Sequence, residues 1–330
     1  MDDRFLNEQR REPDPGFARS LRERLRSTED EAPARRFRLA PALATAAGIA
    51  VVVLLFTMPA MRVAAQNVLD LFRVRSFEGI EVDPARLDQL RSLHDQIGQD
   101  PSTMVLDQQE VLKEPGKPID YPSVDLAGNA AGLPGLKQPR GPLPNGMRFT
   151  KATVQGEGAA RMTLRADKLK KVLELLGITD VQVPSYLDGQ KVTIHMPPIV
   201  TQEYENGTTH LALVESHSPE VALPPGADMK QLGEIGLRVL GLDADEARRV
   251  AAGIDWKSTL VVPVPTSAES FRQVEVNGQK GLFIRCEMPD STGKRHRSGA
   301  VILWTEGDRV LGMQSNLPGE DMLDVAQSLR

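Results

Sequence analysis

The sequence predicts an α+β fold: a single N-terminal transmembrane helix followed by an extracytoplasmic, curved antiparallel sheet with helices on one face. Three observations lead to this prediction. Residues 39–61 carry no charge. The last third of the chain alternates short strand patterns with tight-turn sequences, which is typical of hairpins and therefore of antiparallel pairing. Segments with helical spacing of apolar residues separate these strands.

The uncharged segment 39–61 lies between Arg35, Arg36 and Arg38 on one side and Arg62 on the other. A bilayer core of about 30 Å is crossed by about 20 apolar residues in a helix, so this segment is long enough to span it. Two other interpretations remain open. One is a signal peptide cleaved near Ala65, although its polar leading region would be unusually long; the other is a buried helix of a globular core.

Arginines set the expected orientation, because positive charge is retained on the cytoplasmic side of a membrane. Residues 1–38 therefore form a cytoplasmic arginine-rich tail, with Arg35, Arg36 and Arg38 fixing the topology. The expected location is the cell membrane, in a single-pass arrangement with the C-terminal domain extracytoplasmic.

Within the tail, Phe17, Leu21 and Leu25 recur every four residues and share one helical stripe. One hypothesis is that this stripe folds onto a cytoplasmic partner. The alternatives are a solvated tail whose arginines only set topology and an arginine-rich helix on anionic lipid, which the interspersed acidic residues oppose.

After the membrane segment we expect a juxtamembrane helix–strand–helix segment at 62–113, with a helix that begins at Asp83-Pro84. Residues 114–146 contain seven prolines and six glycines, a density that predicts a linker or long loop without regular elements. Residues 147–330 form the extracytoplasmic α+β domain.

In that domain we expect helices after Asp167, at 229–239, after Asp243 and at the C-terminus. Asn206-Gly207 and Asn277-Gly278 predict two-residue hairpin turns, and Glu306-Gly307-Asp308 predicts a third turn. The expected strands lie at 148–155, 160–165, 191–196, 199–205, 208–215, 259–264, 271–276, 281–288, 300–305 and 309–315.

The sequence lacks the glycine-rich phosphate loops, HExxH, GxSxG and CxxC patterns, so we expect a non-enzymatic protein without cofactor or metal. Its one cysteine, Cys286, is expected to be a buried structural thiol. His195 and His210 could meet Glu203 or Glu205 across neighbouring strands in a metal site, or be ordinary histidines. Trp256 and Trp304 are expected in the core. The basic turn 294–297 is either solvated or a contact for an anionic polymer or lipid.

The C-terminal run VEVNGQKGLFIRCEM, followed by AVILWTEGDRVLGMQSNLPGEDMLDVAQSLR, resembles the end of a bacterial extracytoplasmic domain of unknown function. The segment AAQNVLDLFRVRSFEGIEVDPARL also resembles such membrane proteins, which are anti-sigma-factor-like in arrangement. The resemblance covers 64–106 and 148–330; it implies an envelope-sensor or lipoprotein-carrier type of fold and no catalytic residue. Its motif positions are Val274, Val276, Asn277, Gly278, Leu303, Trp304, Glu306, Gly307, Ala326, Ser328 and Leu329.

We therefore expect a non-enzymatic membrane regulator or sensor whose outer domain binds an envelope component and whose tail contacts a cytoplasmic partner. The alternative is a membrane-tethered lipid- or lipoprotein-binding module with an inert tail. The expected partners are a lipid bilayer, a sigma factor or other regulator, and an envelope lipid or peptide. Nucleic acid is not expected, because the net charge is −5 and only 4% of residues are aromatic.

Overall fold

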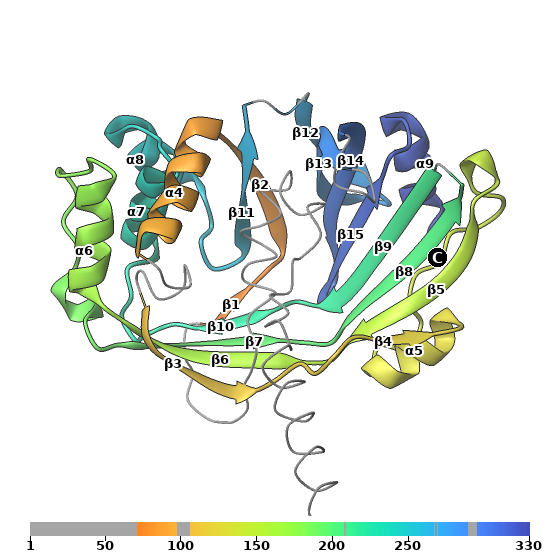
Figure 1. Ribbon diagram of the computed structural model, residues 1–330, viewed down its shortest axis with the longest axis horizontal. Helices are drawn as coiled ribbons and strands as arrows, with labels where there is room; N and C mark the ends of the chain where they lie inside the picture. The colour runs from red at the N-terminus through yellow and green to blue at the C-terminus, as the bar shows by residue number, and fades with distance from the viewer. Residues whose placement is uncertain (1–70, 98–105, 208, 267, 269, 290–295) are drawn as a thin grey trace, which may run out of the picture. The chain divides into compact units, whose positions relative to one another are not determined.

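The computed structural model describes residues 71–97, 106–207, 209–266, 268, 270–289 and 296–330, and these ranges contain mostly antiparallel strands with six α-helices (Figure 1). The helices are α4 (Pro84–Ile97), α5 (Val124–Ala131), α6 (Ala166–Leu175), α7 (Met229–Val239), α8 (Ala244–Gly253) and α9 (Gly319–Ser328). The strands are β1 (Leu71–Arg73), β2 (Ser76–Val82), β3 (Leu106–Lys113), β4 (Ile119–Tyr121), β5 (Arg148–Gln155), β6 (Gly158–Leu164), β7 (Lys191–Met196), β8 (Ile199–Asn206), β9 (Thr209–His217), β10 (Glu220–Ala222), β11 (Thr259–Pro265), β12 (Ser270–Val276), β13 (Gln279–Pro289), β14 (His296–Glu306) and β15 (Arg309–Ser315).

The chain crosses several times between two antiparallel sheets, and it bends at each crossing. One sheet has the order β1-β10-β7-β6-β3, and the other has the order β12-β13-β14-β15-β9-β8-β5-β4. The chain passes from one to the other at Gly156-Glu157, Pro197-Pro198 and Ser218-Pro219, and Figure 1 shows β5, β8 and β9 leading into β6, β7 and β10. Proline has no N–H to donate, so it interrupts the hydrogen-bond ladder where the strands bend.

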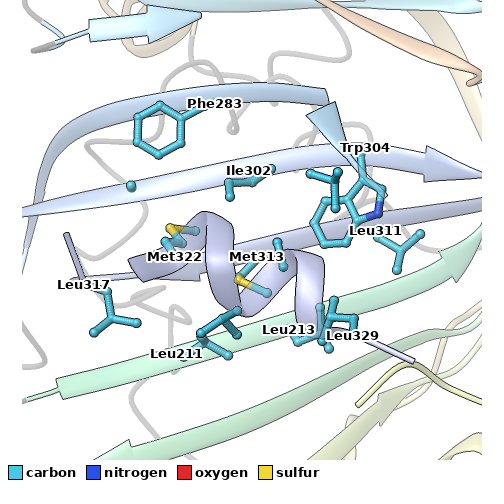
Figure 2. Close-up of a cluster of buried hydrophobic side chains, with 14 of the residues drawn as sticks. Leu211, Leu213, Phe283, Ile302, Trp304, Leu311, Met313, Leu317, Met322 and Leu329 are labelled. Atoms are coloured by element: carbon cyan, nitrogen blue, oxygen red, sulfur yellow. The ribbon is translucent and has the colours of Figure 1, made fainter. Parts of the chain in front are cut away.

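The eight-stranded sheet packs apolar side chains on both of its faces. On one face, α9 contributes Met322 and Val325 to a core around Trp304, Ile302 and Met313 (Figure 2). Helix α5 covers β5 and β8 on the same face through small residues such as Ala127 and Ala131. Burying a large side chain such as Trp304 completely contributes a few kcal/mol, so this cluster is a main source of stability.

On the opposite face, the strand pair β2·β11 packs on β13 and β14. Phe77 of β2 and Val262 and Val264 of β11 meet Leu282 and Ile284 of β13. Strands β2 and β11 pair in parallel, with Thr259 opposite Ser76 and Pro265 opposite Val82. Residues 76–82 and 259–265 are far apart in sequence, so the chain between them makes the long connection that a parallel pair needs.

The remaining helices pack mainly on one another. Val172 and Leu173 of α6 meet Ile235 of α7, and Leu237 of α7 meets Ala247 and Ala251 of α8. This arrangement contradicts the predicted curved sheet with helices on one face. Two sheets, a parallel strand pair and a separate helical cluster replace it, because the apolar stripes of α6, α7 and α8 find partners in each other.

No helix in the ranges that the structure describes is long and apolar enough to cross a membrane. The longest of these helices, α4, has 14 residues, whereas a span needs about 20. This finding contradicts the prediction of a single-pass membrane protein with a cytoplasmic N-terminus and an extracytoplasmic domain, and we do not carry that location further. Residues 39–61 and the topology arginines Arg35, Arg36 and Arg38 lie outside the described ranges.

The expectation of no regular elements in 114–146 is wrong, because this range contains β4 and α5. Ser123 caps α5 by accepting from the Leu126 amide, and Gly132 ends it with a positive φ of 67°. The predicted Asn206-Gly207 and Asn277-Gly278 hairpins are confirmed as β8–β9 and β12–β13. The predicted helix starts at Asp83 and Asp243 are also confirmed, since both carboxylates accept an amide hydrogen bond from the first turn.

Candidate functional site

The residues that the sequence singled out do not come together in one site. Phe17, Leu21 and Leu25 lie outside the described ranges. His210 stands opposite Glu205 near the β8–β9 turn, whereas His195 stands opposite Glu220 in the other sheet. The hypothetical metal site of His195 and His210 is therefore wrong, and the described residues contain no cluster of potential metal ligands.

The other residues that the sequence singled out lie in separate parts of the fold. Trp304 is fully buried in the core of the eight-stranded sheet, as expected. Trp256 packs with α8, and its indole N–H donates to the Ala251 carbonyl at 2.8 Å. Cys286 lies in β13 opposite Gly299. Of the basic turn 294–297, residues 294 and 295 lie outside the described ranges.

Within the described ranges, the strongest candidate site is a cavity of about 410 Å³ at the row of chain bends. Its walls come from four separate parts of the sequence: residues 73–75, the β7–β8 bend, the β9–β10 bend and the β14–β15 turn. We call this cavity the bend cavity. A few hundred cubic ångströms is the usual size of a site for a small ligand.

A gap in the strand ladder accounts for the position of the bend cavity. Ile199 pairs with Ser216, and the next pair along these two chain segments is His195 with Glu220. The residues between these pairs include Pro197, Pro198 and Pro219, so the strands separate here instead of closing the ladder. The sequence contained this signal, because prolines lie just before and just after the predicted hairpin 199–215.

Ser218 fixes one wall of the bend cavity. This buried hydroxyl accepts a hydrogen bond from the Val74 amide at 2.7 Å and donates to the Pro219 carbonyl at 3.3 Å. The Ser218 amide donates to the Asp308 carbonyl at 2.7 Å. One residue thus ties the segment after β1 and the β14–β15 turn to the end of β9, so the cavity is preformed.

Two ion pairs lie at the cavity wall. The Arg73 guanidinium is 2.6 Å from the Glu220 carboxylate, and His217 Nδ1 is 2.8 Å from the Asp308 carboxylate. All four side chains are partly exposed, so each pair adds about 0–1 kcal/mol to stability. The pairs therefore serve mainly to orient the side chains along the wall.

Arg75 differs from the other cations of the bend cavity. Its backbone is fixed on both sides: the amide donates to the Ser258 carbonyl at 2.7 Å, and its carbonyl accepts from the Thr305 hydroxyl at 2.9 Å. Its exposed side chain has no ion pair or hydrogen bond to any residue of the described ranges. Within the described ranges, none of the five N–H donors of the guanidinium is taken up, so they are available to a ligand.

His195 lines the same cavity from β7. Partial burial lowers the pKa of this imidazole below its usual 6.5; Glu220 opposes the change and Lys113 adds to it. Nε2 of His195 lies 3.4 Å from Glu157, which also pairs with Lys113. The neutral form is therefore favoured, so His195 offers a donor or acceptor rather than a fixed positive charge.

Ser218, His217 and Asp308 are the residue types of a catalytic triad, but their arrangement is different. The Ser218 hydroxyl is directed to the Pro219 carbonyl and occupied by the Val74 amide. Both Ser218 and His217 line the cavity, but no hydrogen bond joins them. The Ser218 hydroxyl is therefore not hydrogen-bonded to the histidine–carboxylate pair.

A second polar cluster lies on the face of the eight-stranded sheet that α5 and α9 cover. The Glu215 carboxylate, which is 0% exposed, pairs with Arg309 and accepts from the Lys137 amide at 2.9 Å. Arg309 also donates to the carbonyls of Pro134 at 2.8 Å and Gly135 at 3.2 Å. These groups satisfy one another and fasten the segment 134–137 to the sheet, so the cluster is structural.

Comparison with protein-family models, with curated protein sequences and with solved structures gave no match to this chain.

Proposed function

We propose that this chain is a non-enzymatic regulator or sensor, and that the described part is a binding module whose ligand occupies the bend cavity. The observation that carries this proposal is a preformed cavity at which polar side chains from distant parts of the sequence converge. Such convergence on a concave site is the usual mark of ligand recognition.

Binding rather than catalysis is supported by the state of the polar groups. The Ser218 hydroxyl is engaged by backbone groups on both sides. His217 is paired with Asp308, and Arg73 with Glu220, both in partly exposed positions. An exposed pair without an adjacent nucleophile lacks the arrangement that acyl or phosphoryl transfer requires.

A regulatory role is supported by the position of β1 at the cavity. This three-residue edge strand pairs with β10 and lies directly after the N-terminal residues 1–70. A ligand that contacts Arg73 and Arg75 would stabilise the pairing of β1, because binding stabilises the state that holds the ligand. Ligand binding would in this way be communicated through β1 to the N-terminal segment. Phe17, Leu21 and Leu25 in that segment remain predicted partner contacts.

A lipid- or lipoprotein-binding module is the second candidate, and it uses the same cavity. Val74, Pro197 and Pro198 give the cavity an apolar wall beside its charged one. An amphiphile places its polar end against one wall and its apolar end against the other. Both candidates use the bend cavity, and they differ in the size of the ligand that it binds.

The experiment is a thermal-shift screen of the full chain against a library of small polar metabolites and short-chain amphiphiles. His217→Trp fills the cavity, and Leu175→Trp places the same ring on α6, where Leu175 is exposed and not part of the cavity lining. We expect at least one compound to raise the Tm of the wild type and of Leu175→Trp but not that of His217→Trp. A screen without any such compound would refute the proposal.

A further inference from the structure

The geometry points to an anionic group, a carboxylate or a phosphate, as the part of the ligand that the bend cavity recognises, with Arg75 as its main contact. This inference rests on the proposed function, because it names the ligand class of the same cavity. It goes beyond the proposed function because it names the residue that contacts the ligand and the charge that the ligand carries.

The first step is the unequal state of the two arginines of residues 73–75. Arg73 already holds Glu220 at 2.6 Å. Arg75 lines the cavity without a carboxylate partner in the described part of the chain. An arginine with free donors at a concave site matches the two oxygens of a carboxylate or phosphate in a bidentate manner.

The second step is the rigidity of the Arg75 backbone. Two hydrogen bonds hold it: the Arg75 amide to Ser258 at 2.7 Å, and the Thr305 hydroxyl to the Arg75 carbonyl at 2.9 Å. Thr305 is buried, so this anchor is sheltered from water. A backbone that is already fixed has little entropy of its own to lose on binding, so the ordering cost is confined to the side chain.

The third step is the charge balance of the cavity wall. Glu220 pairs with Arg73, and the Asp308 carboxylate contacts His217. Arg75 is the cation of the wall that has no ion pair within the described ranges. A ligand with a single anionic group completes this arrangement, whereas a cationic ligand would be repelled by Arg75 and would have to break an existing pair.

A second cavity supports the choice by contrast. This second cavity lies near β7 and β10 and has a volume of about 430 Å³. Lys191 is the one charged residue in its lining. Lysine presents a compact, strongly hydrated point charge on a flexible stem. The bend cavity offers the more specific anion contact, so we assign recognition there.

The test is isothermal titration calorimetry of the full chain with sodium phosphate and with sodium succinate at low ionic strength. The variants are Arg75→Gln, Arg75→Lys and the matched control Arg140→Gln. Arg140 is exposed, lies outside the bend cavity and loses the same charge. Non-specific attraction of the anion by the net charge therefore changes equally in Arg75→Gln and Arg140→Gln.

We expect Arg140→Gln to keep the wild-type Kd within about twofold and Arg75→Gln to weaken binding by about tenfold or more. Arg75→Lys should retain part of the affinity, because it keeps the charge but not the planar fork. Equal affinities of Arg75→Gln and Arg140→Gln would overturn the assignment of Arg75. Absence of binding of either anion to the wild type would overturn the anionic class.

Two further probes distinguish the sources of a phosphate group. If the site takes a lipid head group, dihexanoylphosphatidic acid should bind more tightly than glycerol 3-phosphate, and both should depend on Arg75. If it takes a free phosphate ester, the two should bind alike. An uncharged compound that raises the Tm of the wild type but not of His217→Trp would show that the cavity binds a ligand without an anionic group. That result would refute the anionic ligand class and leave the proposed function intact.

Discussion

Two glycines of α7 provide a sharp test of the packing, because the same substitution should have opposite effects at positions only three residues apart. A Cβ on Gly233 would lie 2.2 Å from Cε2 and 2.3 Å from Cζ2 of Trp256. A Cβ on Gly236 would meet nothing within 4 Å. Gly233 is buried and Gly236 is exposed.

The magnitudes follow from two separate contributions. In a helix, alanine is favoured over glycine by about 0.5–1 kcal/mol, and this gain applies at both positions. Overpacking costs about 1–3 kcal/mol, and it applies only at Gly233. The Trp256 ring cannot move away freely, because its N–H is bonded to the Ala251 carbonyl at 2.8 Å.

We therefore expect Gly236→Ala to raise the free energy of unfolding and Gly233→Ala to lie about 1–3 kcal/mol below it. Urea denaturation followed by far-UV circular dichroism measures both values. In a Trp256→Ala background the two alanine variants should become equal, because the clash is gone. Equal stabilities of Gly233→Ala and Gly236→Ala in the wild-type background would refute the packing of α7 on Trp256.

Three further predictions concern other parts of the chain. Glu215→Leu should lower the free energy of unfolding by about 3–5 kcal/mol, because it leaves a half-buried guanidinium without its partner; urea denaturation measures this. Burial raises the pKa of Tyr204 from 10.0 to about 12, so stability that is fully present below pH 10 should be lost as the pH rises toward 12. A fragment of residues 1–38 should retain a protein partner, with sigma factors the first candidates, and should lose it when serine replaces the apolar stripe Phe17, Leu21 and Leu25.

Each of the three has a control that can contradict it. Leu126 is 52% exposed on α5, so Leu126→Ala should change stability by less than about 0.5 kcal/mol, and a similar loss in Glu215→Leu would contradict a buried ion pair. Tyr204→Phe should show a shallower loss of stability above pH 10, since it cannot ionise, and an unchanged slope would exclude Tyr204 as the cause. An unaltered set of retained proteins after the serine replacements would end the tail hypothesis.

Local patterns explain which elements were predictable from the sequence. Asn277 and Gly278 adopt positive φ angles of 50° and 79°, which a tight hairpin turn requires and which few other residue types tolerate. Asp243 caps α8 through a hydrogen bond to an amide three residues on. These features depend on a few consecutive residues, so a sequence pattern is sufficient to place them.

Features that depend on distant partners were not predictable. The pattern of β11 indicates a strand, but nothing in it specifies a parallel partner in β2. Helix α5 was hidden by the glycines and prolines of the surrounding segment 114–146. A Cβ on Gly128 would approach the Leu133 carbonyl to 2.8 Å, so this glycine serves close packing and not chain flexibility. The bend cavity assembles residues 73–75 with residues from three later segments, which no local pattern reports.

Two arginines near the strand bends, Arg309 and Arg75, differ in the role of their side chains. The first has a structural role, and the second is available to bind a ligand. Arg309 is opposite His217 in the ladder, and its guanidinium is saturated by Glu215 and by the carbonyls of Pro134 and Gly135. Arg75 is held by its backbone alone, and its side chain faces the bend cavity. The segment 134–137 closes over the first arginine, whereas no segment of the described ranges satisfies the second. The donors of the half-buried Arg309 are used within the fold, whereas the exposed guanidinium of Arg75 is the group at the cavity that an external anion can pair with.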